Sequence, residues 1–310
     1  MRVGTMPRIE AKAGSQTMNS ETHAPNVADA VQRVGASVVG VATRRHHGAG
    51  VAWREGVVVA SASLLWRAQR VAVVRPDGEQ VDGVLKGIDP TTDLAAVTIA
   101  DTPLPLPERA DAAAVRVGDF VCAVGREPSG AAHASFGHIG AVGGAWRTWR
   151  GGSVERLIRL DGGLYPGLSG AAVCDAQGRV IGIASAAFSR QHGVVLPAAT
   201  VDAVLDQLLA HGRVQQGYLG IAAQPVRAQL DGRGVDGLLV SSVADDGPAA
   251  RAGLLVGDVI VRLAGEPVGG LDTLRRRLQV GAEVALDIAR GGQAWALTVS
   301  VAERPHARCG

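Results

Sequence analysis

The sequence predicts a mainly β protein built from two compact units. The chain has 310 residues, a length that suits two domains. Between Val38 and Ala186, short apolar runs are separated by glycine and turn residues, which is typical of antiparallel barrels or sandwiches. Forty-two glycines against 3% aromatic residues indicate many turns and cores of small residues. We therefore expect a barrel-like unit first and a second strand-rich unit after it.

The strands of the first unit are marked by apolar runs and by the turns between them. Pro76-Asp77-Gly78 and Asp175-Ala176-Gln177-Gly178 each fall between two apolar runs, and both predict hairpin turns. The clearest predicted strands are residues 57–59, 71–74, 95–99 and 179–183.

The apolar periodicity then changes to that of a helix, which we expect to close the first unit. Pro197 precedes this helix and Gly212 is placed as its C-terminal cap. The residues at helical spacing are Val201, Val204, Leu205, Leu208 and Leu209.

Residues 217–303 return to a strand pattern with one further helix, which carries Leu271, Leu274 and Leu278. Arg275-Arg276-Arg277 lies on this helix. We interpret the three arginines as a solvated face, with contact to an acidic partner as the alternative.

Composition excludes several classes of protein. With 47% hydrophobic and 19% charged residues, the chain is not disordered. A net charge of +2 gives no reason to expect nucleic acid or a membrane surface as partner. No apolar stretch approaches the length of about 18 residues that a membrane-spanning helix needs.

The first 25 residues lack the apolar core of a secretory signal. We expect residues 1–25 to form a disordered tail. As written, the chain is expected in the cytoplasm, and in the periplasm if the true start lies upstream.

Three cysteines, Cys122, Cys174 and Cys309, show neither a CxxC pattern nor paired histidine spacing. Cys122 and Cys174 adjoin apolar runs, so we interpret them as buried structural thiols, with a redox role as the alternative. We expect no metal and no cofactor.

Five motifs follow one another along the chain: residues 48–51 (GAGV), 87–95 (GIDPTTDLA), 117–125 (VGDFVCAVG), 166–170 (PGLSG) and 217–221 (GYLGI). Together they resemble the HtrA family of trypsin-like serine proteases with a C-terminal PDZ domain. The resemblance covers roughly residues 35–303. It implies a trypsin-like double β-barrel with its closing helix over residues 26–212 and an α+β PDZ domain over residues 213–305.

The resemblance implies a catalytic serine, histidine and aspartate. Ser169 matches the serine nucleophile and Asp93 matches the aspartate, while the backbone amides of Gly167 and Ser169 match the pair that holds the oxyanion. A turn serine and a turn or N-cap aspartate are the alternatives. Leu168 replaces a residue that is usually polar in the family, which puts the conformation of this loop in doubt.

The sequence departs from the family at the histidine. Residues 57–65 correspond to the strand and turn that carry it, and they place Ser63 at the histidine position. No histidine occurs between His47 and His133, so a shift in alignment cannot supply one. A displaced or substrate-supplied histidine is the alternative. We interpret the nearby histidines as exposed loop residues: His46, His47, His133, His138 and His192.

The fifth motif implies a peptide-binding groove. PDZ domains bind the C-terminus of a peptide as an added strand at a sheet edge. The terminal carboxylate is expected on the backbone amides of Tyr218, Leu219, Gly220 and Ile221. A groove that is intact but unused is the alternative.

We therefore expect an HtrA-like protein that is catalytically impaired and binds C-terminal peptides or unfolded protein segments, in protein quality control or regulation. The competing hypotheses are an active HtrA-family serine endopeptidase with unorthodox proton transfer, and a structural remnant without ligand. The sequence leaves the assignment as an enzyme open. The resemblance also implies a homo-oligomer, a trimer.

Overall fold

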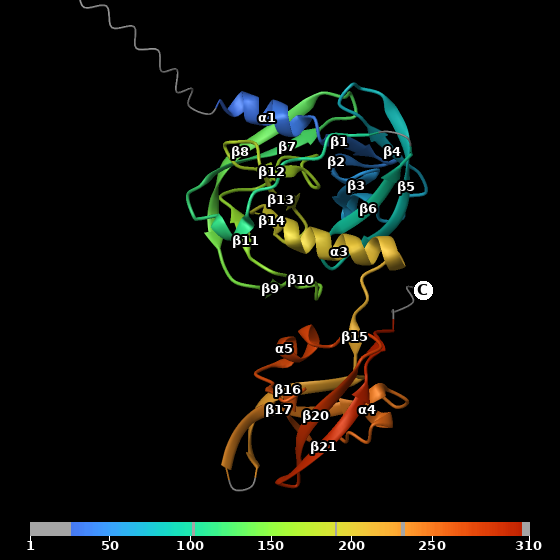
Figure 1. The fold of residues 1–310 in the computed structure, drawn as a ribbon, viewed down its shortest axis with the longest axis vertical. Coiled ribbons are helices and arrows are strands. Elements are labelled where there is room, and N and C mark those ends of the chain that lie inside the picture. The colour runs from blue at the N-terminus through green and yellow to red at the C-terminus, as the bar shows by residue number, and fades with distance from the viewer. Residues whose placement is uncertain (1–25, 101–102, 190, 231–232, 306–310) are drawn as a thin grey trace, which may run out of the picture.

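The computed structural model describes residues 26–100, 103–189, 191–230 and 233–305. The tail predicted over residues 1–25 and Cys309 lie outside these ranges. Two β-barrels lie next to each other, helix α3 (Ala198–His211) runs across both, and a sheet-based module follows at the far end of α3 (Figure 1). This arrangement confirms the prediction of a mainly β chain.

The first barrel closes through six antiparallel strands in the order β1-β2-β3-β6-β5-β4. The predicted hairpin at Pro76-Asp77-Gly78 joins β4 to β5 and is confirmed. The short helix α2 (Ala62–Leu65) follows β3 directly. The strands are β1 (Val38–Ala42), β2 (His47–Arg54), β3 (Val57–Ser61), β4 (Val71–Val74), β5 (Gln80–Asp89) and β6 (Leu94–Ile99).

The second barrel also has six strands, in the order β11-β14-β13-β12-β7-β8. The predicted turn at residues 175–178 joins β12 to β13. A 3-10 turn at Ala112–Ala114 precedes the barrel, and a short pair, β9 (Trp146–Arg147) and β10 (Ser153–Val154), projects from it. The barrel strands are β7 (Phe120–Arg126), β8 (Ala132–Val142), β11 (Ile158–Leu160), β12 (Ala172–Cys174), β13 (Val180–Ser185) and β14 (Val194–Pro197).

Helix α3 begins after Pro197 and ends at His211, with Gly212 as its cap, as predicted. Four of the five predicted apolar positions are buried, but Leu209 is 38% exposed because it lies at the edge of the apolar stripe. Asp202 fastens the helix to the first barrel, since it accepts hydrogen bonds from Trp53 Nε1 at 2.8 Å and from Arg109 at 2.7 Å.

Helix α1 (Val27–Gly35) packs against the second barrel through a buried arginine. Arg126 donates to the carbonyls of Gly35, Val38 and Gly130 at 2.6–2.7 Å. The guanidinium thereby meets carbonyl groups at the C-terminal end of α1 and ties the helix to β7.

The C-terminal module is a sheet in the order β16-β17-β18-β20-β21 with two short helices. Its strands and helices are β15 (Gly217–Tyr218), β16 (Ile221–Leu230), β17 (Arg233–Val243), α4 (Pro248–Arg251), β18 (Val259–Leu263), β19 (Glu266–Pro267), α5 (Leu271–Arg276), β20 (Glu283–Arg290), β21 (Gln293–Ser300) and β22 (Ala302–Glu303).

The second predicted helix is shorter than the sequence suggested. Helix α5 ends at Arg276, Arg277 is its C-cap, and Leu278 lies in the turn that leads to β20. Leu278 is nevertheless buried in the core of the module, where it belongs to the same apolar cluster as Leu274 of α5. Among the described residues, no helix has the length and apolar character needed to cross a membrane.

Candidate active site and peptide cleft

The loop at residues 166–170 leads into β12, and its glycines determine its shape. Gly167 has φ +85°, a left-handed conformation that side-chain-bearing residues rarely adopt. The amide of Leu168 donates to Tyr165 O at 3.2 Å. The amides of Gly167 and Ser169 donate to none of the described residues. Two free amides, one at a serine and one two residues before it, are what an oxyanion site requires.

Ser169 itself is held through its backbone and not through its side chain. Its carbonyl accepts a hydrogen bond from the Ala49 amide of the first barrel at 3.3 Å. Its Oγ atom is buried and has no hydrogen-bond partner among the described residues. No imidazole of the described residues is therefore bonded to this hydroxyl.

Leu168 anchors the same loop in the second barrel. The side chain is fully buried in the barrel core. A Cβ built on Gly125 would lie 2.8 Å from Leu168 Cδ2, so the glycine in β7 makes room for it. The apolar residue at this position thus holds the loop by packing.

Asp93 is the centre of a buried hydrogen-bonded cluster of serines, the Asp93 pocket, which lies where the first barrel meets Ser185 of the second. It is 1% exposed and stands at the start of β6. Ser61 Oγ donates to both carboxylate oxygens at 3.0 Å, and Ser185 Oγ donates to Oδ2 at 2.7 Å. The backbone amide of Ser63 donates to Oδ1 at 2.8 Å. The carboxylate therefore accepts hydrogen bonds from three groups of the protein itself.

Ser63 extends this network toward the surface. Its side chain is exposed, although the other residues of α2 are buried, and its Oγ atom is 2.7 Å from Ser61 Oγ. Sequence reasoning placed Ser63 and Asp93 in one site but missed Ser61 and Ser185. Hydroxyl groups can donate to a carboxylate, but they cannot accept a proton near neutral pH.

The prediction that the histidines lie in loops is wrong for three of them. His47 is the first residue of β2, and His133 and His138 lie in β8. His133 is partly buried because its strand partner is Gly125, whose missing side chain leaves room for the ring. The Nδ1 atom of His133 is buried without a partner among the described residues.

Two of these rings lie beside the loop at residues 166–170, called the nucleophile loop because Ser169 matches the family's nucleophile. A Cβ built on Gly167 would be 3.7 Å from His133 Nε2 and 4.0 Å from His47 Cδ2. This proximity could not be read from the sequence, because His133 reaches the loop only through the pairing of β7 with β8. Neither ring is hydrogen-bonded to Ser169 Oγ.

The predicted carboxylate loop lines a cleft of about 830 Å³. Gly220 has φ +80°, and the carbonyls of Leu219 and Gly220 accept hydrogen bonds from Ala249 at 2.8 Å and Ala244 at 2.7 Å. The amides of Leu219 and Gly220 donate to none of the described residues. They are thus available for a ligand. The next strand, β16, is an edge strand and can accept an added strand.

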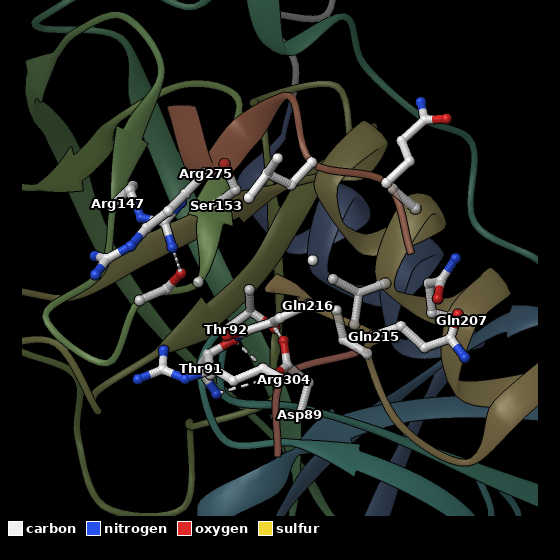
Figure 2. A pocket seen from close by; sticks show the side chains of 18 of the residues that line it. Asp89, Thr91, Thr92, Arg147, Ser153, Gln207, Gln215, Gln216, Arg275 and Arg304 are labelled. Atoms are coloured by element: carbon white, nitrogen blue, oxygen red, sulfur yellow. Dashed lines mark hydrogen bonds between the residues drawn. The ribbon is translucent and has the colours of Figure 1, made fainter. Parts of the chain in front are cut away.

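The cleft has walls from both parts of the chain (Figure 2). Leu271, Leu274 and Leu278 contribute apolar surface on the C-terminal side. On the opposite side, Thr91 and Thr92 donate to Asp89 at 2.7 and 2.6 Å. The cationic side chains around the cleft belong to Arg147, Arg275 and Arg304, labelled in Figure 2.

The connection between α3 and the C-terminal module is short and held at its ends. Arg213 donates to both carboxylate oxygens of Glu303 at 2.7 and 2.8 Å. Gly217 and Tyr218 then pair with Glu303 and Ala302 as β15 and β22.

In the described part of the chain, no group of three or more His, Cys, Asp or Glu side chains is arranged to hold a metal.

Comparisons with known proteins bear on both parts of the chain. Residues 48–183 match the trypsin-like peptidase domain and residues 239–290 match the PDZ domain. A probable periplasmic serine endoprotease, DegP-like, of Brucella suis biovar 1 (strain 1330) is 34% identical over 271 residues, which cover 81% of this chain and 51% of that protein. The chain spans about half the length of the curated relatives it matches.

Solved structures are similar over most of the chain. The structure of the HtrA-type protease AlgW with a decapeptide has a TM-score of 0.78 and 26% sequence identity to this chain. The alignment covers 91% of this chain and 100% of the AlgW chain. The structure of AlgW with a tripeptide has a TM-score of 0.76 and 30% sequence identity. That alignment covers 92% of this chain and 100% of the AlgW chain. These likenesses confirm the prediction of a trypsin-like double barrel followed by a PDZ domain.

Proposed function

Because the chain belongs to the HtrA family of trypsin-fold proteins with a PDZ domain, we propose that it is a catalytically impaired member that binds C-terminal peptides or unfolded protein segments. In this role it acts as a scaffold, a holdase or a regulator in protein quality control. Its partners are defined by a free peptide carboxylate and an extended backbone.

One observation carries the loss of catalysis, namely the serine-lined pocket of Asp93. We infer that Ser63 stands at the histidine position, because its amide and the hydroxyl bonded to it both connect to the aspartate. The carboxylate that should orient an imidazole is instead bonded by Ser61 and Ser185. Ser169 Oγ is left with no base bonded to it among the described residues.

The magnitude of this loss decides the proposal. Removing the histidine of a serine-protease triad costs on the order of 10⁶ in turnover. That factor corresponds to about 8 kcal/mol of transition-state stabilisation. The oxyanion amides and substrate binding supply only roughly 10³–10⁴ over the reaction in water. We infer that such residual activity is too small for a working protease.

Peptide recognition is supported by the cleft. The free amides of Leu219 and Gly220 suit a terminal carboxylate, and the edge of β16 suits the peptide backbone. Arg275 and Arg304 line the same cleft and favour an anionic ligand. The related AlgW structures are described with peptides, which agrees with this assignment.

We propose three further properties of the whole protein. The domains are the barrel unit over residues 26–212 and the PDZ domain over residues 213–305, separated where α3 ends. The location is the periplasm, as in the names of the relatives, which give the cytoplasmic expectation no support. The oligomer is a trimer, which a measurement of molar mass in solution will test.

The proposal is tested by treating the pure protein with a fluorophosphonate probe and assaying casein cleavage alongside, with trypsin as positive control. We expect weak labelling and cleavage no greater than that of Ser169→Ala. Robust labelling with turnover that Ser169→Ala abolishes would overturn the proposal. In that event His133→Ala identifies whether the ring beside Gly167 serves as the base.

A further inference from the structure

The second barrel contains a pair of cysteines that the proposed function does not use. Cys122 in β7 and Cys174 in β12 are directly opposed in the strand register. They are 1% and 0% exposed, and their Sγ atoms are 2.9 Å apart. The two thiols therefore contact each other inside the core of the second barrel.

Their placement suits a covalent bond. Directly opposed residues of antiparallel strands have Cα atoms roughly 4.5–5.5 Å apart, within the range of roughly 4.4–6.8 Å found in disulfides. The two sulfur atoms need to approach by only about 0.9 Å to reach bonding distance. We propose that Cys122 and Cys174 form a disulfide that cross-links β7 and β12.

The bond forms by thiol–disulfide exchange with an oxidant that is itself a disulfide, such as oxidised glutathione. The Cys122 thiolate attacks one sulfur of the oxidant, gives a mixed disulfide and releases the first glutathione thiolate. The Cys174 thiolate then attacks the Cys122 sulfur and releases the second. Two protein thiols lose two electrons, the oxidant gains them, and both thiol protons pass to the released glutathione.

The two thiols differ in acidity. The hydrogen bond between their sulfur atoms lowers the pKa of Cys122, while the same contact and burial raise the pKa of Cys174. This difference favours the Cys122 thiolate as the first attacking group.

Burial determines when the bond can form and break. Neither thiol is open to solvent in the folded barrel. The oxidant must therefore act while the barrel is still forming, and reductants reach the finished bond only when the barrel opens.

The cross-link also acts on the candidate active site. The two cysteines are 52 positions apart, so the bond closes a long loop of the unfolded chain. Strand β12 begins shortly after Ser169, so the bond tethers the segment that follows the nucleophile loop to β7.

The test uses the full chain with Cys309→Ser, which removes the third thiol. The protein is refolded with a mixture of reduced and oxidised glutathione, then alkylated in guanidinium without reductant and mapped by mass spectrometry. We expect neither cysteine to be alkylated and a linked peptide pair containing residues 122 and 174. Alkylation of both cysteines would overturn the inference. The matched control, Cys174→Ala with Cys309→Ser, leaves Cys122 alkylated.

A second measurement reads the effect of the bond on stability. Protein reduced in guanidinium and refolded under reductant should melt roughly 10 °C below the oxidised form. The double variant Cys122→Ala/Cys174→Ala should melt at the same temperature under both conditions. Equal melting of the oxidised and reduced chain would contradict a stabilising cross-link. Because thiol counts do not depend on proteolysis, this inference stands or fails separately from the proposed function.

Discussion

The nucleophile loop of the second barrel and the Asp93 pocket of the first barrel differ in how their polar groups are partnered. In the loop, the Ser169 hydroxyl and the amides of Gly167 and Ser169 have no hydrogen-bond partner among the described residues. In the pocket, the Asp93 carboxylate receives bonds from Ser61, Ser185 and the Ser63 amide.

The two regions therefore differ in whether their polar groups can still form hydrogen bonds with a ligand. An unpaired buried donor costs about 1–3 kcal/mol, so a free hydroxyl and free amides gain from a ligand that meets them. The Asp93 carboxylate already accepts from three donors, so an added imidazole would compete with Ser61 for it. The Asp93 carboxylate is therefore bonded within the protein, while the loop at Ser169 keeps polar groups that have no hydrogen-bond partner among the described residues.

The largest test of this comparison is to place an imidazole beside Asp93 with Ser63→His. The side chain at 63 is exposed although the other residues of α2 are buried, so a larger ring can extend toward solvent. We expect casein cleavage to rise about 10³-fold, less than the roughly 10⁶ that a triad histidine supplies, because Ser61 competes for Asp93. Initial rates on casein measure this effect.

Two variants control this experiment. Ser63→Ala removes the hydroxyl without adding a base and should gain nothing. Ser63→His/Ser169→Ala should lose whatever activity Ser63→His has gained. A folded Ser63→His protein with no gain would show that the nucleophile loop, with Leu168 buried in it, is not competent.

The second largest effect is expected from removing the Asp93 carboxylate. Asp93→Ala leaves the hydroxyls of Ser61 and Ser185 without their acceptor, so we expect a loss of about 3 kcal/mol in the free energy of unfolding. Urea denaturation measures it. Asp82→Ala, at an exposed site on β5, should change the free energy by less than about 0.5 kcal/mol. Equal effects of the two variants would contradict a stabilising role for Asp93.

A third prediction extends the comparison to the peptide cleft, whose amides are free like those of the nucleophile loop. Short peptides with an apolar C-terminal residue should bind at least about 10-fold more tightly with a free carboxylate than with an amidated end. Titration calorimetry measures both affinities. Gly220→Ala should reduce the preference, because φ +80° strains a side-chain-bearing residue. Equal affinities for the two peptides would argue against the assigned loop.

The smallest effect concerns Asp258 of the PDZ domain, a second buried carboxylate that the protein satisfies itself. Burial raises the pKa of Asp258, but the bonds from Arg290 and the Leu255 amide outweigh it and bring the pKa below the ordinary 3.8. A lowered folded-state pKa gives stability that is present above pH 3.8 and lost as the pH falls through the folded-state value.

We therefore expect the melting temperature to drop on acidification below about pH 4. Arg290→Gln should melt lower than the unmodified chain at pH 7, and this gap should narrow in acid once Asp258 is protonated. A gap that stays constant with pH would contradict the role of this pair. Melting curves followed by circular dichroism across the pH range provide the measurement.

Much of the fold was predictable because it depends on local patterns. Short apolar runs between glycine and turn residues predicted the strands, and Pro76-Asp77-Gly78 marked a hairpin that the structure contains. Helix α3 followed from its apolar stripe. Helix α5 was predicted too long, since the burial of Leu278 arises from a turn and not from continued helix. Spacing alone does not distinguish these two ways of burying a leucine.

The candidate site was predictable only in part. Ser63, Asp93, Gly167 and Ser169 stood out because they fall within ordered motifs. Ser185 did not, because it meets Asp93 from 92 positions away through the contact between the barrels. The position of His133 was also not predictable, because this residue reaches the nucleophile loop through the pairing of β8 with Gly125 of β7.

By itself, the sequence determined the order of strands and helices, and it established that no histidine lies between His47 and His133. Only the tertiary structure decided what the remaining groups meet: three serines around one carboxylate, two thiols across one strand pair, and two imidazole rings beside Gly167. Local structure depends on neighbours in the chain, whereas these contacts depend on strand register, and a shift of one residue would turn each side chain to the opposite face.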